Sequence, residues 1–198
     1  MKGIWTTRAA NPDIVMLWAA AVLCFFGFFR SGEITVPSLN SFDARVHLSW
    51  LDIAIDNPKD PRLLRIKLKR SKTDQLGKGV EIYVGRTGCS LCPIAAVSAY
   101  MISRGDRQGP FFIFRNNQPL TKPKFVKLVR EALQTAELPY QSFAGHSFRI
   151  GAATAAAKAG IEDSTIQMMG RWSSAAFLAY IRMLKEQLAN FSGLLAKT

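Results

Sequence analysis

The distribution of apolar residues along the chain predicts one long buried helix near its start. Residues 14–29 are almost all apolar, and the Asn11-Pro12-Asp13 turn in front of them is a typical helix start. The run ends at Arg30 after 16 residues, whereas a helix needs roughly 18 to 20 apolar residues to cross a bilayer. We therefore expect a core helix and no membrane partner.

Alternating apolar and polar positions predict a small antiparallel sheet. Residues 46–55, 62–69 and 80–84 alternate in this way, and the last two segments flank a polar loop at residues 70–79, as the strands of a β-hairpin do. Arg and Lys fill the polar positions of the first hairpin strand, so one side of the hairpin is cationic. A further short strand is expected at residues 111–114.

Helical spacing dominates the second half of the chain. The expected helices cover residues 94–104, 123–137, 146–159 with Gly160 as a C-terminal cap, a short segment capped by Asp163 or Ser164 that ends near Gly170, and about 173–190. The predicted fold class is therefore mainly α with a small antiparallel β-sheet, an α+β fold.

The net charge of the chain indicates which class of partner it binds. The 198 residues include 26 Lys and Arg against 14 Asp and Glu, a net charge of +12. Residues 1–60 carry 5 basic and 6 acidic groups, so the excess lies after Pro61, most densely in residues 62–72. A polyanion is the natural partner of such a surface, and nucleic acid is the commonest one. The alternatives on charge alone are a basic protein with merely solvated charges, or a membrane-surface protein.

Two pairs of polar residues are candidates for a site. Arg30 directly follows the buried run, so its guanidinium needs a partner, and Glu33 can supply the carboxylate, in a site or as a structural ion pair. His146 and Arg149 are three residues apart and share a helix face, where they can hold a phosphate or serve as a helix cap and a surface residue.

The remaining candidates are weak when taken singly. Trp172 and Tyr180 each fit ordinary helix packing, and Lys72 is one of many lysines in the basic hairpin. Cys89 and Cys92 form a lone CxxC pair with no second pair and only two histidines in the chain, so we expect no metal site. Three cysteines are also too few for a disulfide scaffold, which favours a reducing compartment.

Taken in order, these residues resemble the catalytic series of the tyrosine recombinase (phage integrase) family, Arg…Lys…His-x-x-Arg…His/Trp…Tyr. The matching residues are Arg30, Lys72, His146, Arg149, Trp172 and Tyr180. The sequences around them, residues 25–33, 71–74 and 170–182, look most like the recombinases of eukaryotic mobile elements, the DIRS-like, Ngaro-like and crypton group. The resemblance covers about residues 12–185.

The resemblance implies a reaction that needs no metal and no cofactor. One DNA strand is cleaved through a covalent 3′-phosphotyrosyl link to Tyr180 and is then rejoined to a different 5′-hydroxyl. Arg30 and Arg149 hold the non-bridging phosphate oxygens with their planar guanidiniums, because charge gathers on these oxygens in the transition state. His146 and Trp172 donate further hydrogen bonds to the same oxygens.

Two proton transfers complete the implied reaction. Tyr180 must lose its proton to attack, although an unperturbed tyrosine has a pKa of about 10, and His146 can accept that proton. The departing 5′-oxygen needs a proton, which a lysine on the hairpin can deliver as a general acid. Lys72 is the first choice, and Lys69 and Lys78 are alternatives because the sequence does not determine the hairpin register.

Supporting contacts are expected around this series. Glu33 supports Arg30 through their ion pair. DNA contacts are expected from the basic hairpin and from other basic positions, namely Arg65, Lys67, Lys69, Arg70, Lys78, Lys122, Lys124 and Arg171. The expected partner is double-stranded DNA.

The resemblance also implies an organisation for the protein. We expect a single catalytic domain over residues 1–198, with a core at about 12–185 and a tail at 186–198 that either contacts a neighbouring protomer or folds back on its own domain. The separate N-terminal core-binding domain of the family is expected to be absent, since only about ten residues precede the first helix. The protein is expected to be a monomer in free solution and a tetramer on DNA. It would be nuclear if it comes from a eukaryotic mobile element, and otherwise cytoplasmic or nucleoid-associated.

Two other functions remain open on the sequence. A DNA-binding module derived from a recombinase would keep the basic surface and no longer cut DNA. A type IB topoisomerase would share the tyrosine chemistry, although the short spacing from Trp172 to Tyr180 looks more like a recombinase.

Overall fold

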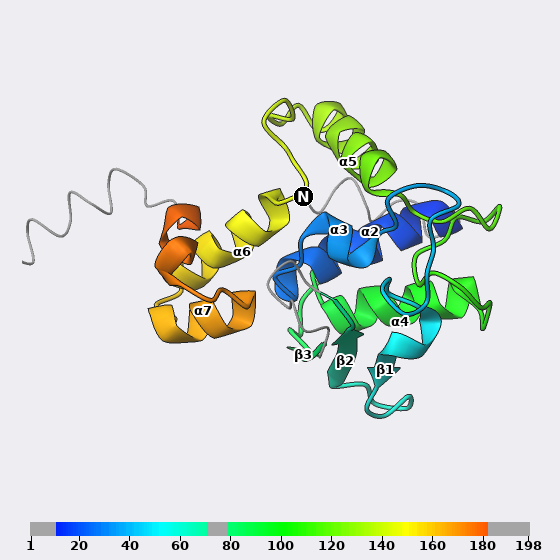
Figure 1. Ribbon diagram of the computed structural model, residues 1–198, viewed down its shortest axis with the longest axis horizontal. Coiled ribbons are helices and arrows are strands. Elements are labelled where there is room, and N and C mark those ends of the chain that lie inside the picture. The colour runs from blue at the N-terminus through cyan, green and yellow to red at the C-terminus, as the bar shows by residue number, and fades with distance from the viewer. Residues whose placement is uncertain (1–10, 71–78, 182–198) are drawn as a thin grey trace, which may run out of the picture.

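The computed structural model describes residues 11–70 and 79–181. In chain order its elements are α2 (Pro12–Phe26), α3 (Ser31–Ile34), η1 (Trp50–Asp52), β1 (Ile53–Ile55), β2 (Leu63–Leu68), β3 (Val80–Gly85), α4 (Pro93–Arg104), α5 (Lys122–Thr135), α6 (Ser147–Lys158), α7 (Asp163–Gly170) and η2 (Ala175–Tyr180) (Figure 1). The two η elements are 3-10 helices. Helices dominate and the three strands form one antiparallel sheet, so the predicted fold class is confirmed.

Helix α2 is the centre of the main core. The side chain of Asn11 caps it by accepting the Asp13 backbone N–H at 2.9 Å, as the helix-start pattern predicts. Met16 and Leu23 have no exposed surface, and α2 packs along α4. Within the described ranges, no helix is both long and apolar enough to span a bilayer.

The turn after α2 brings the chain sharply to α3. The helix ends at Phe26, three residues before the predicted end, because Gly27 caps it and Phe28 takes a left-handed φ of 52°. A Cβ at Gly27 would lie 2.2 Å from the Phe29 ring, so a glycine is required for that ring to fold back over the helix end. The turn therefore places Arg30 immediately before α3.

The predicted hairpin is confirmed in its described strands. β2 and β3 are antiparallel, and every second residue of β2 is buried. Ile66, in the middle of β2, faces Ile53 on one side and Ile82 on the other. The Arg and Lys positions of β2 point to solvent, as the alternation predicts.

The strand predicted over residues 46–55 is wrong for most of its length. Only Ile53–Ile55 pairs with β2. The preceding residues form η1, because the Asp52 carboxylate accepts the Ser49 backbone N–H at 2.7 Å and turns the chain. A local side-chain hydrogen bond thus competes successfully with strand pairing.

The strand predicted at residues 111–114 is also wrong. Ile113 makes a single isolated bridge to Pro119, and the segment is not part of the sheet. Its backbone bonds the Tyr100 hydroxyl instead: this hydroxyl donates to the Phe111 carbonyl at 2.9 Å and accepts the Ile113 N–H at 2.8 Å. Burial around this hydroxyl raises the pKa of Tyr100 to about 12.

A second apolar cluster lies at the C-terminal side of the molecule, where Figure 1 shows α6 and α7 away from α4 and the sheet. Its buried members are Phe28, Ala152, Ala153, Ala156, Ile166, Trp172 and Phe177. Phe28 belongs to the turn after α2, so the cluster packs α6, α7 and η2 against that turn.

Two details of this region differ from the prediction. Glu162 occupies the position before α7, where Asp163 or Ser164 was expected. The long helix predicted over residues 173–190 is a 3-10 helix in its described part, and the Ile181 N–H continues this pattern by bonding the Leu178 carbonyl three residues earlier at 3.1 Å.

Candidate active site

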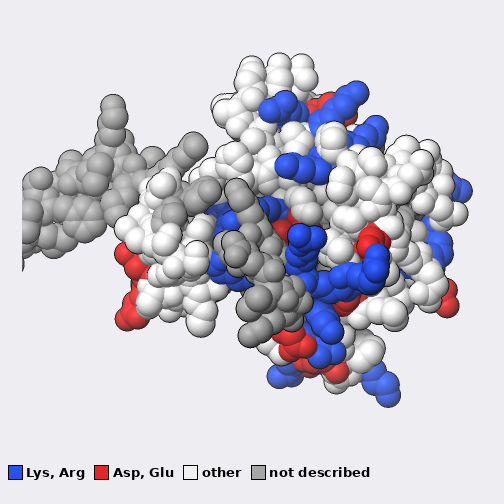
Figure 2. Space-filling view, viewed as in Figure 1, with Lys and Arg blue, Asp and Glu red and all other residues white. Residues whose placement is uncertain are grey.

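An open pocket of about 520 Å³ lies where α3, the start of α5 and the turn before α6 meet. The titratable side chains that line it are Arg30, Glu33, His47, Arg70, Lys122 and His146. Figure 2 shows Lys and Arg side chains gathered in a band from α5 across the centre of the molecule toward the sheet. A pocket with several cations and one carboxylate suits an anionic ligand.

Arg30 is held at the wall of this pocket by Glu33, and the predicted ion pair is present. The Arg30 Nη1 donates to Glu33 Oε1 at 3.0 Å, and the Arg30 backbone N–H donates to Glu33 Oε2 at 2.9 Å. The Arg30 side chain keeps 27% of its surface exposed, while Glu33 keeps 7%. The pair therefore orients a guanidinium that still reaches solvent.

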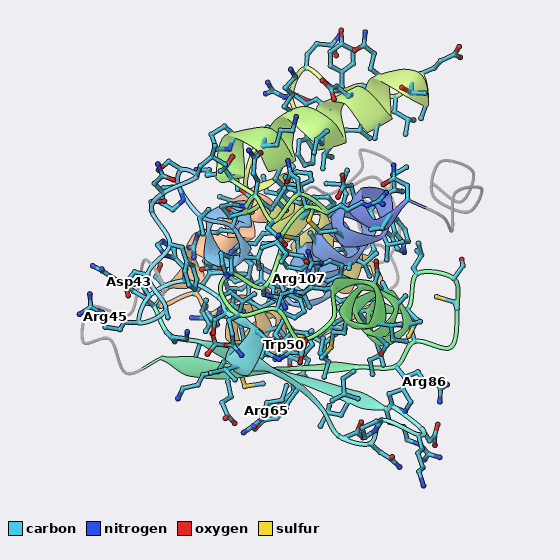
Figure 3. All side chains as sticks on the ribbon, turned by 90° about the vertical axis from the view of Figure 1, so that its right-hand side faces the viewer. Asp43, Arg45, Trp50, Arg65, Arg86 and Arg107 are labelled. Carbon is cyan, nitrogen blue, oxygen red and sulfur yellow. The ribbon has the colours of Figure 1, made fainter. Side chains whose placement is uncertain are left out.

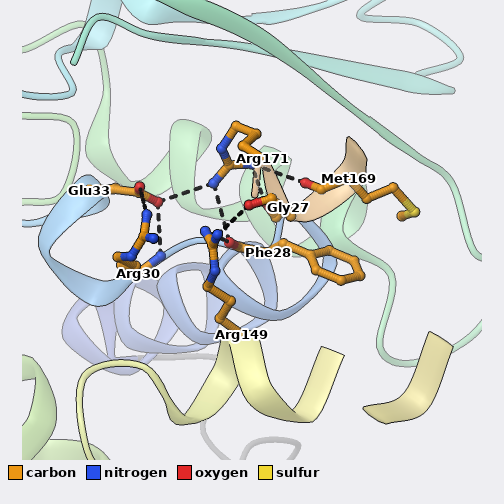
Figure 4. A network of polar contacts seen from close by, with 8 residues as sticks. Gly27, Phe28, Arg30, Glu33, Arg149, Met169 and Arg171 are labelled. Atoms are coloured by element: carbon orange, nitrogen blue, oxygen red, sulfur yellow. Dashed lines mark hydrogen bonds and ion pairs between the residues drawn. The ribbon is translucent and has the colours of Figure 1, made fainter. Parts of the chain in front are cut away.

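Glu33 has a second cationic partner that the sequence did not predict. The Arg171 Nη2 donates to Glu33 Oε2 at 3.1 Å and to the Phe28 carbonyl at 3.2 Å, and its Nη1 donates to the Gly27 carbonyl at 3.0 Å (Figure 4). Burial lowers the pKa of the Arg171 guanidinium, and the Glu33 carboxylate opposes this shift. Since these donors are engaged inside the protein, Arg171 does not fit the predicted role of a DNA contact.

Arg149 lies beside this network and not at the pocket. Its side chain is almost fully buried, with 1% of the residue exposed. The guanidinium donates to the Phe28 carbonyl at 3.1 Å and to the Gly170 carbonyl. Its central carbon also lies 4.1 Å from the centre of the Trp172 ring, within cation–π range.

Trp172 packs in the second apolar cluster. Its ring contacts the rings of Phe28 and Phe177, with centroid distances of 6.3 and 5.9 Å. A Cβ at Gly170 would lie 1.5 Å from the Trp172 ring, so this close approach depends on glycine. The structure thus groups Trp172 with Arg149, behind the pocket that Arg30 lines.

His146, in contrast, lines the pocket. It is exposed and directly precedes α6, whose first residue is Ser147. The turn before α6 is tied to α3, because the Ser31 backbone N–H donates to the Gly145 carbonyl at 2.9 Å. This single bond between distant segments brings His146 to the same pocket as Arg30.

Tyr180 and Lys72 complete the predicted series. Tyr180 ends η2, three residues after the buried Phe177, and its backbone alone is described. Lys72, the preferred general acid, and Lys78, one of its alternatives, lie outside the described residues.

Lys69, the other alternative for the general acid, is engaged elsewhere. Its ammonium is paired with the buried Asp52 carboxylate and also donates to the carbonyls of Ala44 and His47. Only 16% of its side chain is exposed. Lys69 therefore does not fit the predicted roles of a general acid or a DNA contact.

The other predicted DNA contacts are accessible. Arg65 and Lys67 are exposed on β2, and Figure 3 shows Arg65 on the outer side of the sheet, where it pairs with Glu81 at 3.1 Å. Arg70 and Lys122 are exposed and line the pocket. Lys124 is exposed on the first turn of α5.

Sequence reasoning missed His47 in this pocket. The signal was slight: the chain has two histidines, and both prove to line one pocket although 99 positions separate them. No motif contained His47. The described residues include no group of three or more His, Cys, Asp or Glu side chains arranged to hold a metal ion.

Comparison with known proteins gives a family match. A model of the Phage integrase family matches residues 46–186. The chain is 29% identical over 164 residues to an integrase/recombinase XerD homolog of Selenomonas ruminantium, in an alignment covering 79% of this chain and 43% of that protein. The chain thus spans less than half the length of this relative.

Solved structures with the same fold come from several recombinases. The XerH site-specific recombinase, bound to its palindromic difH substrate in a post-cleavage complex, superposes with a TM-score of 0.67 at 15% identity, covering 94% of this chain and 47% of that one. The XerA recombinase gives a TM-score of 0.66 at 15% identity, covering 91% and 56%. The Tn1549 transposon integrase, in complex with circular intermediate DNA, gives 0.58 at 13% identity, covering 96% and 61%. The described fold is therefore that of a tyrosine recombinase catalytic domain.

Proposed function

Because the chain belongs to the Phage integrase family, we propose that it is the catalytic domain of a site-specific DNA recombinase. It cleaves and rejoins DNA strands through a covalent 3′-phosphotyrosyl intermediate, in DNA integration or the transposition of a mobile element. The observation that supports this best is the pocket in which Arg30, Lys122 and His146 meet, with Glu33 already neutralised by two arginines.

In this proposal the pocket receives the scissile phosphodiester. Arg30 offers a fork of N–H donors whose direction Glu33 sets in advance, so little reorganisation is needed when charge develops on the non-bridging oxygens. Lys122 and Arg70 add positive charge to the same pocket. Cationic side chains thereby supply the charge stabilisation that a metal ion provides in other phosphoryl-transfer sites, and we propose a metal-independent reaction.

Tyr180 is the proposed nucleophile. Its phenolate oxygen attacks phosphorus, the P–O bond to the 5′-oxygen breaks, and a phosphotyrosine diester forms without change in oxidation state. The phenol proton passes to His146, and the leaving 5′-oxygen takes a proton from Lys72. Rejoining reverses these steps with a different 5′-hydroxyl as the attacking group.

Arg149 and Trp172 must move to take part in this reaction. The Arg149 guanidinium bonds the Phe28 and Gly170 carbonyls inside the protein. Because it is buried and does not line the pocket, it must shift to reach a phosphate oxygen there, and the Trp172 ring that covers it would move as well. We propose that DNA binding causes this rearrangement.

The proposed substrate is double-stranded DNA, contacted outside the pocket by the exposed side chains of Arg65, Lys67 and Lys124. We also propose a monomer in free solution that forms a tetramer on DNA through residues 186–198, which lie outside the described residues. Truncation after Lys185 should then lower recombination between two duplexes more than cleavage of one. A nuclear location and an affinity to eukaryotic mobile elements stay predictions from the local motifs.

A nicked suicide substrate tests the central claim. The protein first selects a duplex from a random-sequence library, and a nick is then placed so that the short cleaved strand is lost and the adduct is trapped. We expect a covalent protein–DNA adduct that survives SDS and forms in EDTA. Tyr180→Phe should abolish the adduct while leaving binding to the same duplex nearly unchanged. An adduct that persists in Tyr180→Phe would contradict the assignment.

The same experiment separates the alternatives. The inward position of Arg149 favours one of them, a DNA-binding module that does not cut. Such a module would select a duplex and form no adduct. A topoisomerase of type IB would form the adduct and relax supercoiled plasmid without exchanging strands between two selected sites.

A further inference from the structure

His47 lines the candidate phosphate pocket, and none of the proposed reaction steps uses it. It belongs to the loop between α3 and η1, which also carries Asp43 and Arg45 (Figure 3). Its side chain is half-buried and lines the same pocket as Arg30 and His146. A histidine in such a pocket can be a base, a donor or only a part of the loop.

The loop holds the His47 ring in one orientation. The Asp43 backbone N–H donates to His47 Nδ1 at 2.9 Å, and the His47 backbone N–H donates to the Asp43 carbonyl at 2.8 Å. The Lys69 ammonium bonds the His47 carbonyl at 3.1 Å. The ring also lies against Phe42, with 6.2 Å between the centroids. The imidazole is therefore positioned before any ligand arrives.

These contacts decide which ring nitrogen carries the proton. A nitrogen that accepts an N–H hydrogen bond has no proton of its own, so neutral His47 is protonated at Nε2. Nε2 has no hydrogen-bond partner among the residues that the structure describes. Both oxygens of the Asp43 carboxylate are instead bound by Arg45, whose Nη2 and Nε donate to them at 2.8 and 3.1 Å, and this pairing lowers the pKa of Asp43 to about 2.

The pocket that His47 lines carries three cations, Arg30, Arg70 and Lys122, and the Glu33 carboxylate. Because Nδ1 is occupied by the Asp43 N–H, the ring nitrogen that His47 can offer to a ligand is the N–H donor Nε2.

We infer that His47 is a further catalytic residue, which donates its Nε2–H to an oxygen of the phosphate bound beside Arg30. This inference rests on the proposed function of the pocket. A neutral donor suits the step, because it strengthens as negative charge develops on the oxygen and needs no proton transfer of its own. His146 keeps the role of proton acceptor.

Two substitutions separate the donor from the loop contact. The Oδ1 of His47→Asn can still accept the Asp43 N–H, but this side chain is too short to replace Nε2. The amide of His47→Gln can place a donor near the Nε2 position. We expect His47→Asn to keep the wild-type unfolding midpoint and to form the suicide-substrate adduct about a hundredfold more slowly, the scale of losing one preorganised donor. His47→Gln should recover about tenfold of this loss.

A spectroscopic measurement tests the same inference without DNA cleavage. With two histidines in the chain, imidazole ¹⁵N spectra of the Tyr180→Phe protein have two sets of signals, which His146→Gln assigns. We expect His47 in the Nε2–H form, with an Nε2 signal that shifts when the selected duplex is added. A Nδ1–H form, or no shift while His146 shifts, would overturn the inference.

The outcomes also distinguish this inference from the proposed function. Normal adduct formation by His47→Asn overturns the role of His47 and leaves the recombinase proposal in place. A duplex-induced shift at His47 without any wild-type adduct supports the phosphate contact and overturns the recombinase proposal. A protein that selects no duplex overturns both.

Discussion

The two arginines that the family series assigns to one phosphate lie in different surroundings. Arg30 stands at the wall of an open pocket, 27% of its side chain is exposed, and a carboxylate sets its direction. Arg149 is 1% exposed and bonds two backbone carbonyls under the Trp172 ring. One half of the candidate site is therefore open, and the other half is packed as core.

The difference originates in the short turn between α2 and α3. The Phe28 carbonyl in this turn accepts hydrogen bonds from both Arg149 and Arg171, and the left-handed φ of Phe28 turns the chain at this point. Arg30, two residues later, is already beyond the turn and faces the pocket. The turn thus separates two guanidiniums that look equivalent in the sequence. Its Phe28 carbonyl binds Arg149 on the buried side, while Arg30 faces the pocket.

The largest effect is expected from Arg149→Ala. Hydrogen bonds from a charged donor contribute about 1.5–3 kcal/mol each, and this substitution removes two of them from the core. We expect the free energy of unfolding to fall by at least about 3 kcal/mol, measured by urea denaturation, together with loss of the DNA adduct. Loss of the adduct at unchanged stability would show that Arg149 faces the pocket and not the carbonyls.

Arg30→Ala should separate activity from stability. Adduct formation should fall by about a hundredfold or more, because a preorganised donor to the phosphate is lost. The free energy of unfolding should change by less than about 1 kcal/mol, since Arg30 is partly exposed and Glu33 keeps its bond to Arg171. A destabilisation as large as that of Arg149→Ala would remove the contrast between the two arginines.

Local signals made much of this architecture predictable. The period of two in β2 predicted its buried and basic faces, and the spacing of Arg30 and Glu33 predicted their ion pair. Both depend on neighbours in the chain. The strand predicted over residues 46–55 was wrong because of another local interaction. The Asp52 carboxylate accepts the Ser49 N–H and turns the chain where the alternation indicated a strand.

The contacts that build the site are long-range and carry no such signal. Arg171 reaches Glu33 across 138 positions, and Arg149 reaches Phe28 across 121. Arg171 therefore looked like one more surface cation in a basic chain, although its donors are used inside the protein. His47 reaches the pocket because the folded loop holds it there, which no spacing in the sequence could indicate.

Gly170→Ala should test the packed half. The added Cβ would meet the Trp172 ring at 1.5 Å, so the ring that covers Arg149 must move. We expect a loss of about 1–3 kcal/mol in urea denaturation, the range for overpacking a core. Gly151→Ala is the matched control, because its Cβ would lie 3.6 Å from Phe25 in ordinary contact. Equal effects of the two would argue against tight packing at Trp172.

Gly145→Ala tests the open half of the site, the pocket that Arg30 lines, and we expect it to have the smallest effect of these substitutions. The added Cβ would lie 2.5 Å from Ser31 Oγ and 3.1 Å from Lys122 Cε, and both atoms belong to side chains that can move aside. We expect a stability loss below about 1 kcal/mol and an adduct rate about tenfold lower, because displacement of a positioned group by a fraction of an ångström would slow the proposed phosphoryl transfer.

Ser31→Ala supplies the internal control for this prediction. The Ser31 Oγ is buried and has no hydrogen-bond partner among the described residues, so its removal should cost little. The double variant Gly145→Ala, Ser31→Ala relieves the closer contact, and it should recover most of the lost adduct rate if the clash with Ser31 is the cause. A double variant as slow as Gly145→Ala alone would assign the defect to Lys122 instead, and additive losses would show that the two positions act independently.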